Sequence, residues 1–293
     1  MKSFRTVFAL MVLCSAFGTL SAVPAQAPEQ LVLMAIDPAQ VLKKDMKVLR
    51  TPAGFGAQIS PDGKHLVFAS MHSESNAIWV SDTDGSNAVR VASIEGHEVG
   101  TPRWAPDGKW IAFDVDGLQH GRIFVVSAVG GELREIAKTD AQNVVPNWSR
   151  DGKWIYFASD RTGRWQVWKV PFASGEPVPV SRRSGFAASE SPDGEYVYFS
   201  QHRFPSPRIL RVPVSGGDEE VVSYDLKPDT WADWWVTNDG IYFASGGTNH
   251  PTLARFDPNT KSVETVAQLG ETSFFLSVSD DGRLAICDVW VPR

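Results

Sequence analysis

Cysteine is almost absent from this sequence. The chain of 293 residues has two cysteines, Cys14 and Cys287, and the first lies in an N-terminal segment that we expect to be removed. A single remaining cysteine cannot form an internal disulfide, so an exported protein of this composition must be stabilised by packing. Hydrophobic residues make up 43% of the chain and charged residues 21%, which is typical of a globular protein.

Motifs that carry catalysis or bind metals are also missing. The sequence has no Gly-x-Ser-x-Gly, no His-Glu-x-x-His, no cysteine–histidine zinc spacing, no phosphate-binding loop and no dinucleotide-binding glycine pattern. Its histidines are scattered: His65, His72, His97, His120, His202 and His250. We therefore favour a non-enzymatic function, without catalytic residues, cofactor or metal. A metal site assembled from separate parts of the chain stays open as the alternative, as in metal-dependent lyases and lactonases that act on sugar-derived substrates.

Long hydrophobic runs are confined to the N-terminus. The apolar segment Val7–Phe17 follows two basic residues, and Ala25-Gln26-Ala27 is a small-residue cleavage pattern. This predicts a signal peptide over residues 1–27 and a periplasmic or secreted protein. Cleavage after Ala25 is an alternative because Pro28 follows Ala27, and so is an uncleaved anchor. No later segment is long and apolar enough to span a bilayer, so we expect no membrane insertion after cleavage.

Positive charge is in deficit. The chain has 28 basic and 34 acidic residues, and removal of the signal segment takes away two basic residues, leaving a net charge of −8. An acidic surface disfavours nucleic acid and anionic membranes as partners.

What the sequence does contain is an Asp-Gly pair that recurs six times. The pairs begin at Asp62, Asp107, Asp151, Asp193, Asp239 and Asp281, at intervals of 45, 44, 42, 46 and 42 residues. This period fits a four-stranded propeller blade. Strand-like runs flank each pair: KHLVFAS or KWIYFAS directly after it, AIWVSD or QVWKVPF further on, and AVRVA or PVPVS after a second turn. Each repeat is therefore predicted to be one strand, a Pro-Asp-Gly-type turn and three more antiparallel strands.

The Asp-Gly residues are expected to form turns rather than ligand sites. Asp accepts hydrogen bonds from the backbone that follows it, and Gly adopts a positive φ without steric cost. Ser81–Asn87 superficially resembles a calcium loop, but it lacks the remaining ligands and the distal Glu of that motif.

Four tryptophans share the register of the repeat. Trp104 and Trp148 precede the turn, and Trp110 and Trp154 follow it at equivalent places. Repeated register predicts that these large side chains pack between blades, with ligand stacking as the alternative.

The sixth repeat ends after its second strand, which would leave the ring open. Leu31–Ile36 and Met46–Thr51 have the spacing of a third and a fourth strand. Because exposed sheet edges are a liability, we expect residues 31–51 to complete the last blade; a loose N-terminal arm is the alternative. The predicted fold is all-β: a six-bladed β-propeller of four-stranded antiparallel blades, closed by N-terminal strands, as one domain over residues 28–293.

Segments such as SPDGKHLVFAS, PRWAPDGKWIAF and VPNWSRDGKWIYFASDRTGRWQVWKV resemble those of TolB-like (WD-repeat-like) β-propellers. The resemblance covers about residues 31–291 and is greatest to sensor-type propellers that some bacteria fuse to regulators or kinases. It implies the propeller fold. It does not select a function, because the same blades serve scaffolds, sensors and protease-gating domains.

The first strands of a propeller line its axis, and one position in them stands out. It reads Gln58, Arg103, Asn147, Ser189, Trp235 and Ser277, mostly polar residues in otherwise apolar strands. This predicts the wall of a solvated channel. The loops that enter these strands add His97, Glu98, Asp140, Gln142, Asn143, Arg183, Asp229, Trp231 and Asp233.

The segment KPDTWADWW departs most from the repeat, and local departures are where function is expected. An exposed Trp231 beside acidic residues could bind a peptide, a sugar or a cation; alternatively, Trp231 and Trp234 pack between blades. We predict a monomeric, exported module that binds a protein or peptide of the cell envelope. The predicted binding residues are Gln58, Arg103, Asn147, Ser189, Trp235, His97, Asp229, Trp231 and Asp233.

Overall fold

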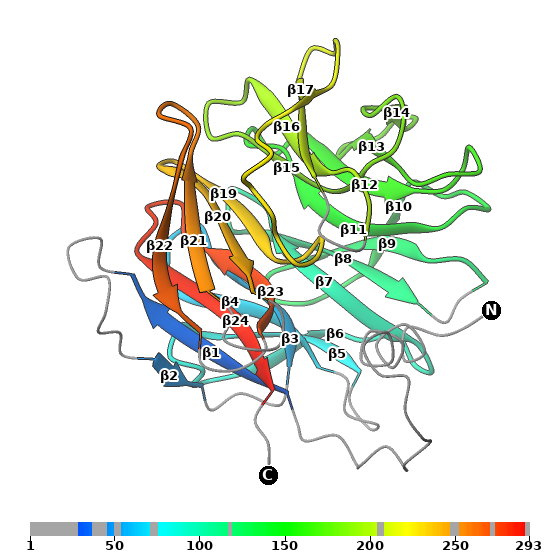
Figure 1. The fold of residues 1–293 in the computed structure, drawn as a ribbon. Helices are drawn as coiled ribbons and strands as arrows, with labels where there is room; N and C mark the ends of the chain where they lie inside the picture. The colour runs from blue at the N-terminus through cyan, green and yellow to red at the C-terminus, as the bar shows by residue number, and fades with distance from the viewer. Residues whose placement is uncertain are drawn as a thin grey trace, which may run out of the picture.

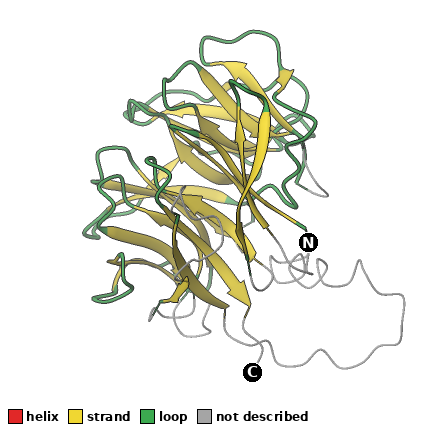
Figure 2. Ribbon diagram, turned by 60° about the vertical axis from the view of Figure 1, so that its left-hand side comes forward, coloured by secondary structure: helices red, strands yellow, loops and turns green. Residues whose placement is uncertain are grey.

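A computed structural model describes residues 29–36, 46–49, 54–70, 76–116, 119–203, 208–246, 252–269 and 273–290. Within these ranges all regular secondary structure is β-strand (Figure 2). The strands form six four-stranded sheets. This confirms the predicted all-β propeller. The predicted signal peptide over residues 1–27 lies outside the described residues.

Five of the six blades are continuous in sequence, and each runs from an inner to an outer strand. Blade 1 comprises β3 (Phe55–Ile59), β4 (His65–Ser70), β5 (Ala77–Asp82) and β6 (Val89–Ala92). Blade 2 comprises β7 (Glu98–Trp104), β8 (Trp110–Asp116), β9 (Arg122–Ser127) and β10 (Arg134–Ile136). Blade 3 comprises β11 (Asn143–Trp148), β12 (Trp154–Ser159), β13 (Gln166–Pro171) and β14 (Val178–Pro179).

The remaining blades follow the same plan around the ring (Figure 1). Blade 4 comprises β15 (Phe186–Glu190), β16 (Tyr196–Ser200), β17 (Ile209–Pro213) and β18 (Glu220–Val221). Blade 5 comprises β19 (Trp234–Thr237), β20 (Gly240–Ser245), β21 (Thr252–Asp257) and β22 (Ser262–Gln268). Blade 6 joins the two ends of the chain: β23 (Ser273–Val278), β24 (Leu284–Trp290), β1 (Glu29–Ala35) and β2 (Met46–Val48).

The ring is closed in blade 6 by the N-terminal strands. β1 pairs antiparallel with β24, from Glu29 opposite Trp290 to Ala35 opposite Leu284, and β2 pairs with the other edge of β1. Leu31 is fully buried in a cluster with residues of blade 1. The prediction that residues from both ends share the last blade is confirmed. Without β1, β24 would present an unpaired edge.

Four of the six Asp-Gly turns are built from a Ser-x-Asp-Gly sequence, whereas blade 2 has Ala105 and blade 5 has Thr237 in place of the Ser. In blade 3, Ser149 Oγ donates to Asp151 Oδ1 at 2.7 Å, and the Lys153 N–H donates to the same oxygen at 3.0 Å. Trp154 N–H in turn donates to Ser149 Oγ at 2.9 Å. Gly152 takes a φ of 70°, which glycine adopts most easily. The turn therefore satisfies its own polar groups and starts the second strand without help from a ligand.

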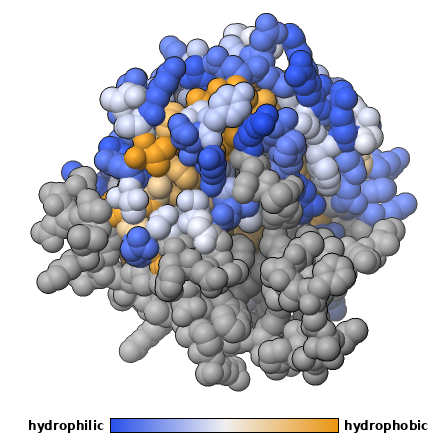
Figure 3. All heavy atoms as spheres, viewed as in Figure 1, coloured by the Kyte–Doolittle hydropathy of each residue, from blue (hydrophilic) through white to orange (hydrophobic). Residues whose placement is uncertain are grey.

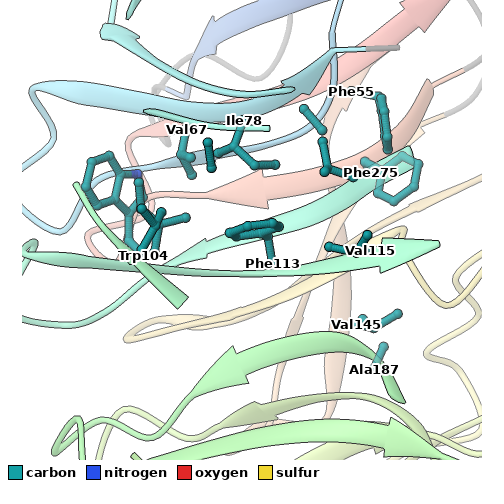
Figure 4. Packing of buried hydrophobic residues seen from close by; sticks show 14 of the residues in the cluster. Phe55, Val67, Ile78, Trp104, Phe113, Val115, Val145, Ala187 and Phe275 are labelled. Atoms are coloured by element: carbon teal, nitrogen blue, oxygen red, sulfur yellow. The ribbon is translucent and has the colours of Figure 1, made fainter. Parts of the chain in front are cut away.

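Aromatic side chains pack where blades meet. Trp104 and Trp148 are buried, and Trp148 stands edge-on to Phe172 at 4.8 Å between ring centroids. Trp110 and Trp154 are only partly buried, and Lys169 Nζ lies 4.9 Å from the Trp154 ring. The predicted packing between blades is thus confirmed for Trp104 and Trp148. It also holds for Trp110, whose ring stands edge-on to Phe172 of blade 3 at 5.5 Å, whereas Trp154 contacts Lys169 of its own blade. Figure 4 shows one core cluster, with Trp104 at one end and Phe55 beside Phe275 at the other.

Large hydrophobic side chains are exposed only singly on the part of the surface that the structure describes. Its coloured part in Figure 3 is largely hydrophilic, with hydrophobic residues showing near the middle. The large hydrophobic residues exposed in the described part of the chain are scattered over outer strands and loops of different blades: Val89, Val129, Val178, Tyr224 and Val263. Single exposed apolar residues of this kind are normal on a soluble surface.

Candidate functional site

Five of the six inner strands share a position with a positive φ. Gly56, Thr101, Val145, Ala187 and Phe275 all have a φ between 39° and 66°, and each lies at a register shift of its strand. Such bulges re-aim the side chains that follow them. Two are held by carboxylates of the preceding blade, because Asp288 accepts from the Gly56 N–H at 3.0 Å and Asp114 accepts from the Val145 N–H at 2.9 Å. The bulges thus fix the residues that line the channel.

The channel has two unlike ends. We call the end with the Asp-Gly turns the turn end, and the opposite end, where the chain enters each inner strand, the loop end. At the loop end an aromatic arc crosses the blades, with successive ring centroids 5.2–5.6 Å apart. The arc consists of Trp165, Phe186, Trp231, Phe275 and Phe55. Each of its rings thus contacts the next across neighbouring segments of the described chain.

The structure distinguishes the two interpretations of Trp231 and Trp234. Trp231 is only 4% exposed and sits in the middle of the arc. Trp234 is also buried, and its indole N–H donates to Ser200 Oγ at 2.8 Å. The alternative interpretation, that these tryptophans pack between blades, is the one that the structure supports. The entering segment breaks the repeat because it supplies this packing.

Asp233 occupies the repeat position that carries the bulge in the other blades. Its carboxyl oxygens are buried and make no hydrogen bond within the described residues, although Thr230 and the Phe275 backbone lie close enough to favour the charged form. Burial, with the charge of Asp229, raises the pKa of Asp233 to about 7. A carboxyl group this enclosed does not face a ligand at the mouth.

The remaining entering-loop residues also lie at the loop end. His97 and Asp229 are partly exposed, and Asp140 and Arg183 are exposed. Gln142 Oε1 accepts from the Gly121 N–H at 2.7 Å, and Asn143 Nδ2 donates to Thr139 Oγ1 at 3.0 Å. The amides of Gln142 and Asn143 therefore hold loops in place. None of these residues lines the pocket described next.

An axial pocket of about 360 Å³ opens at the turn end. All six blades contribute to its lining, which includes Gln58, Asp62, Trp104, Asn147, Arg150, Ser189, Glu190, Trp235, Asn238, Asp280 and Asp281. Four of the predicted channel residues, Gln58, Asn147, Ser189 and Trp235, meet here. A concave site of this size can accommodate a small ligand or the end of a peptide.

The polar wall residues also join neighbouring blades. Gln58 Oε1 accepts from the Trp104 N–H at 2.6 Å, and Asn147 Nδ2 donates to the Ala188 carbonyl at 2.8 Å. The Asn147 oxygen is used as well, because it accepts from the Trp148 N–H at 2.9 Å. These hydrogen bonds explain part of the polarity of the channel without a ligand. The Gln58 side-chain nitrogen takes part in none of these three bonds.

An ion pair crosses the rim of the pocket. Arg150 Nη1 lies 3.0 Å from Asp280 Oδ1 and 3.1 Å from Oδ2, and the two residues come from opposite blades, 3 and 6. Hydrogen bonds from neighbouring Ser and backbone groups lower the pKa of Asp62 and Asp281 on the same rim, so both are ionised at neutral pH. The rim is therefore acidic overall.

Sequence reasoning missed these rim residues, although a signal for them was present. The residue directly before Asp in the turn is Pro61, Pro106 and Pro192 in three repeats. In the other three it is Arg150, Asn238 and Asp280. Proline suits the turn conformation, so the polar replacements mark positions with an additional role.

Arg103 forms the floor below the pocket. Its side chain is 8% exposed and lines a void of about 30 Å³ that shares Asn147, Ser189 and Trp235 with the pocket above. Nη1 donates to the Pro102 carbonyl at 2.8 Å and the Gly56 carbonyl at 3.3 Å. The guanidinium carbon lies 5.3 Å from the ring centroid of Trp235 on the opposite blade. Burial lowers the pKa of Arg103 to about 10, so the group stays cationic at neutral pH.

A family model for the TolB β-propeller domain matches residues 36–190, which is more than half of the chain. The chain belongs to the TolB β-propeller family. This confirms the resemblance seen in the repeats. No curated protein matches the chain significantly.

Solved structures show the same fold at low sequence identity. A TolB-type protein from Agrobacterium tumefaciens is similar with a TM-score of 0.71 and 19% identity, covering 91% of this chain and 100% of that one. TolB from Acinetobacter baumannii has a TM-score of 0.60 and 16% identity, and the alignment covers 92% of this chain but 65% of that one. An oligogalacturonate lyase from Vibrio parahaemolyticus has a TM-score of 0.58 and 14% identity, covering 85% and 81%. At these identities the likeness concerns the fold.

Two further observations concern the described part of the chain. It contains no cluster of three or more His, Cys, Asp or Glu residues that could hold a metal ion. It also contains no helix long and apolar enough to cross a membrane.

Proposed function

We propose that this TolB-family propeller is a binding module of the cell envelope that holds a peptide or protein segment in its axial pocket. The observation that carries the proposal is a pocket lined by all six blades, open at the turn end and backed by Arg103, Trp235 and the aromatic arc. A concave pocket between packed blades can hold the end of a ligand without a large change in the backbone. Gln58, Asn147, Ser189 and Trp235 would line the ligand.

The cell envelope is proposed as the location because of the N-terminal sequence. A short basic region, the apolar segment Val7–Phe17 and the small-residue pattern ending at Ala27 are the features of a secretory signal. An acidic mature chain also fits a protein or peptide partner better than nucleic acid. We propose that the mature chain acts as a monomer.

The rival function is a metal-dependent enzyme acting on a sugar-derived substrate, by analogy with the lyase of similar fold. Such an enzyme needs a group that activates its substrate, and no metal-ligand cluster is formed by the described residues. Binding therefore remains the function that the pocket supports best.

The test uses a photo-crosslinking residue, p-benzoylphenylalanine, placed at Ser189 in mature chain expressed in its own cell envelope. The matched control carries it at Val129, which is 93% exposed on the turn between β9 and β10, at the same end of the ring but outside the pocket. We expect one envelope protein to be crosslinked from Ser189 and not from Val129. Adding the substitution Asn238→Trp, which places a larger side chain on the pocket wall, should abolish that crosslink.

Elemental analysis of the purified chain distinguishes the rival function. If a stoichiometric metal copurifies and no crosslink depends on the pocket, the enzyme alternative replaces the binding module. Equal crosslinking from Ser189 and Val129 would also contradict the proposed site.

A further inference from the structure

Arg103 is a buried cation whose hydrogen-bonding capacity is only partly used. A guanidinium has five N–H donors, and in the described part of the chain only Nη1 of Arg103 meets acceptors, both of them backbone carbonyls. The charges of Asp114 and Asp288 act on it through space. A charged group that is nine-tenths buried with unmet donors is costly unless a partner completes it.

The guanidinium adjoins ligand space. Its carbon lies over the Trp235 ring, 5.3 Å from the centroid, and Arg103 lines the void of about 30 Å³. The N–H donors of a guanidinium lie in its plane. In that plane a carboxylate accepts two parallel hydrogen bonds, a geometry that lysine cannot offer. The void beside Arg103 adjoins the axial pocket, since both are lined by Asn147, Ser189 and Trp235.

The charges along the axis are arranged in layers. Arg103 is the cation at the floor, while Asp62, Asp280 and Asp281 outnumber Arg150 at the rim. A ligand that matches both layers carries a negative group at its inserted end and a positive group behind it. The pocket volume of about 360 Å³ holds a few residues of a peptide.

Resting on the proposed binding function, we propose that Arg103 is a carboxylate receptor, and that the ligand is a peptide that inserts a carboxylate toward Arg103 and carries a Lys or Arg at the rim. Trp235 positions the guanidinium and moves aside as the carboxylate enters. The carboxylate belongs either to a peptide C-terminus or to an Asp or Glu side chain.

The experiment uses three probe peptides of the same length and NMR of the full mature chain. They are acetyl-Ala-Lys-Ala-Ala with a free C-terminal carboxylate, its C-terminal amide, and acetyl-Ala-Lys-Ala-Asp amide. The readouts are the dissociation constants and the shift of the Arg103 Nε–H signal in the unmodified protein. We expect the first or third peptide to bind at least tenfold more tightly than the plain amide and to move the Arg103 signal. Which of the two binds identifies the source of the carboxylate.

Substitutions then test the role of Arg103 against that of an arginine outside the pocket. Arg103→Gln should abolish the preference for the carboxylate peptides, and Arg103→Lys should leave a reduced preference. Arg90→Gln, at an exposed arginine on the outer strand β6 that does not line the pocket, should preserve it. Because Arg103→Gln removes a buried charge and could impair folding, the Arg103 Nε–H shift in the unmodified protein decides the matter independently.

The outcomes separate this proposal from the proposed function. If the amide binds as tightly as both carboxylate peptides, or the Arg103 signal does not move, the carboxylate receptor is refuted while a binding pocket remains. If no probe binds at millimolar concentration but the Ser189 crosslink is obtained, the ligand class is wrong and the module stands. If no probe peptide binds and no crosslink forms from Ser189, both the carboxylate receptor and the proposed binding function are refuted.

Discussion

At the residue scale, the Ser-x-Asp-Gly turns are held together by local hydrogen bonds. The Ser hydroxyl, the Asp carboxylate and two backbone N–H groups bond to one another in blades 1, 3, 4 and 6. Blade 2 has Ala105 in place of Ser, and only the Lys109 N–H to Asp107 bond remains there, at 2.9 Å. The backbone around Ala105 is nonetheless the same, since Ala105 and Ser149 make equivalent backbone hydrogen bonds. Blade 2 therefore lacks the two hydrogen bonds that the Ser hydroxyl makes in the Ser-containing turns, because Ala105 has no side-chain oxygen.

Adding the missing hydroxyl group at position 105 should stabilise the protein. In Ala105→Ser the new hydroxyl can donate to Asp107 and accept from the Trp110 N–H, as Ser149 does with Asp151 and Trp154. A hydrogen bond contributes about 0.5–1.5 kcal/mol net, so we expect the free energy of unfolding to rise by about 1 kcal/mol. The measurement is urea unfolding followed by tryptophan fluorescence. The matched substitution Ser149→Ala should lower the same quantity by about 1–2 kcal/mol; an unchanged value for both would show that the motif is neutral.

At the element scale, the strand that closes the ring is the critical one. β1 pairs with β24 along its whole length and buries Leu31 and Met34. It comes from the opposite end of the chain from β23 and β24. Its pairing with β24 therefore completes blade 6, and its buried side chains pack blade 6 against blade 1. A propeller closed in this way opens only when β1 leaves, which exposes the edge of β24.

A substitution in β1 should therefore destabilise the whole ring. Leu31→Ala leaves a cavity among Ile59, Leu66, Phe68 and Ile286, and buried leucine truncations typically cost about 2–5 kcal/mol. We expect that loss in the free energy of unfolding, together with faster hydrogen exchange in both blade 6 and blade 1. The control is Ala35→Ser at the exposed end of the same strand, which should change stability by less than about 0.5 kcal/mol. If Leu31→Ala were no worse than Ala35→Ser, the N-terminal strand would not be holding the ring closed.

At the scale of the whole molecule, titration of buried and turn carboxyl groups sets the pH dependence of stability. Asp62, Asp151, Asp193 and Asp281 have a pKa below the usual value of 3.8 because the turn bonds favour the ionised form. The folded state then holds fewer protons than the unfolded state at acidic pH, so stability falls as the pH drops below about 4. Burial raises the pKa of Asp233, Asp114 and Glu190, which acts in the opposite direction.

Asp233 should dominate the change in the free energy of unfolding between about pH 4 and about pH 7. Its pKa is about 7 in the folded state against 3.8 as the ordinary value, so the folded protein binds a proton that the unfolded chain has already lost. Stability therefore decreases as the pH rises from about 4 to about 7, by as much as about 4 kcal/mol at 1.36 kcal/mol per pKa unit. In Asp233→Asn this decrease should become much smaller, with the largest gain in stability at pH 8. The measurement is urea unfolding at pH 5 and pH 8; equal pH dependence in both proteins would contradict the assignment.

The sequence alone determined the architecture, because it is written in repeated local signals. Six Asp-Gly turns at blade spacing, with strand patterns between them, specify the blades, and the missing strands of the last repeat are found near residue 31. Trp104 and Trp148 were predictable for the same reason: a large side chain at one register packs in the same place in each blade. The inner-strand position that reads Gln58, Asn147, Ser189 and Trp235 also did reach the pocket wall.

What only the tertiary structure decided is where along the channel the described residues form a pocket. Trp231 and Asp233 look like a binding surface in sequence, but both are buried, and Trp231 packs between the rings of Phe186 and Phe275. Arg150 meets Asp280, and Arg103 meets Trp235, across the axis from opposite blades. No local pattern encodes such pairs, because their partners lie more than a hundred residues apart in sequence and come together only when the ring closes.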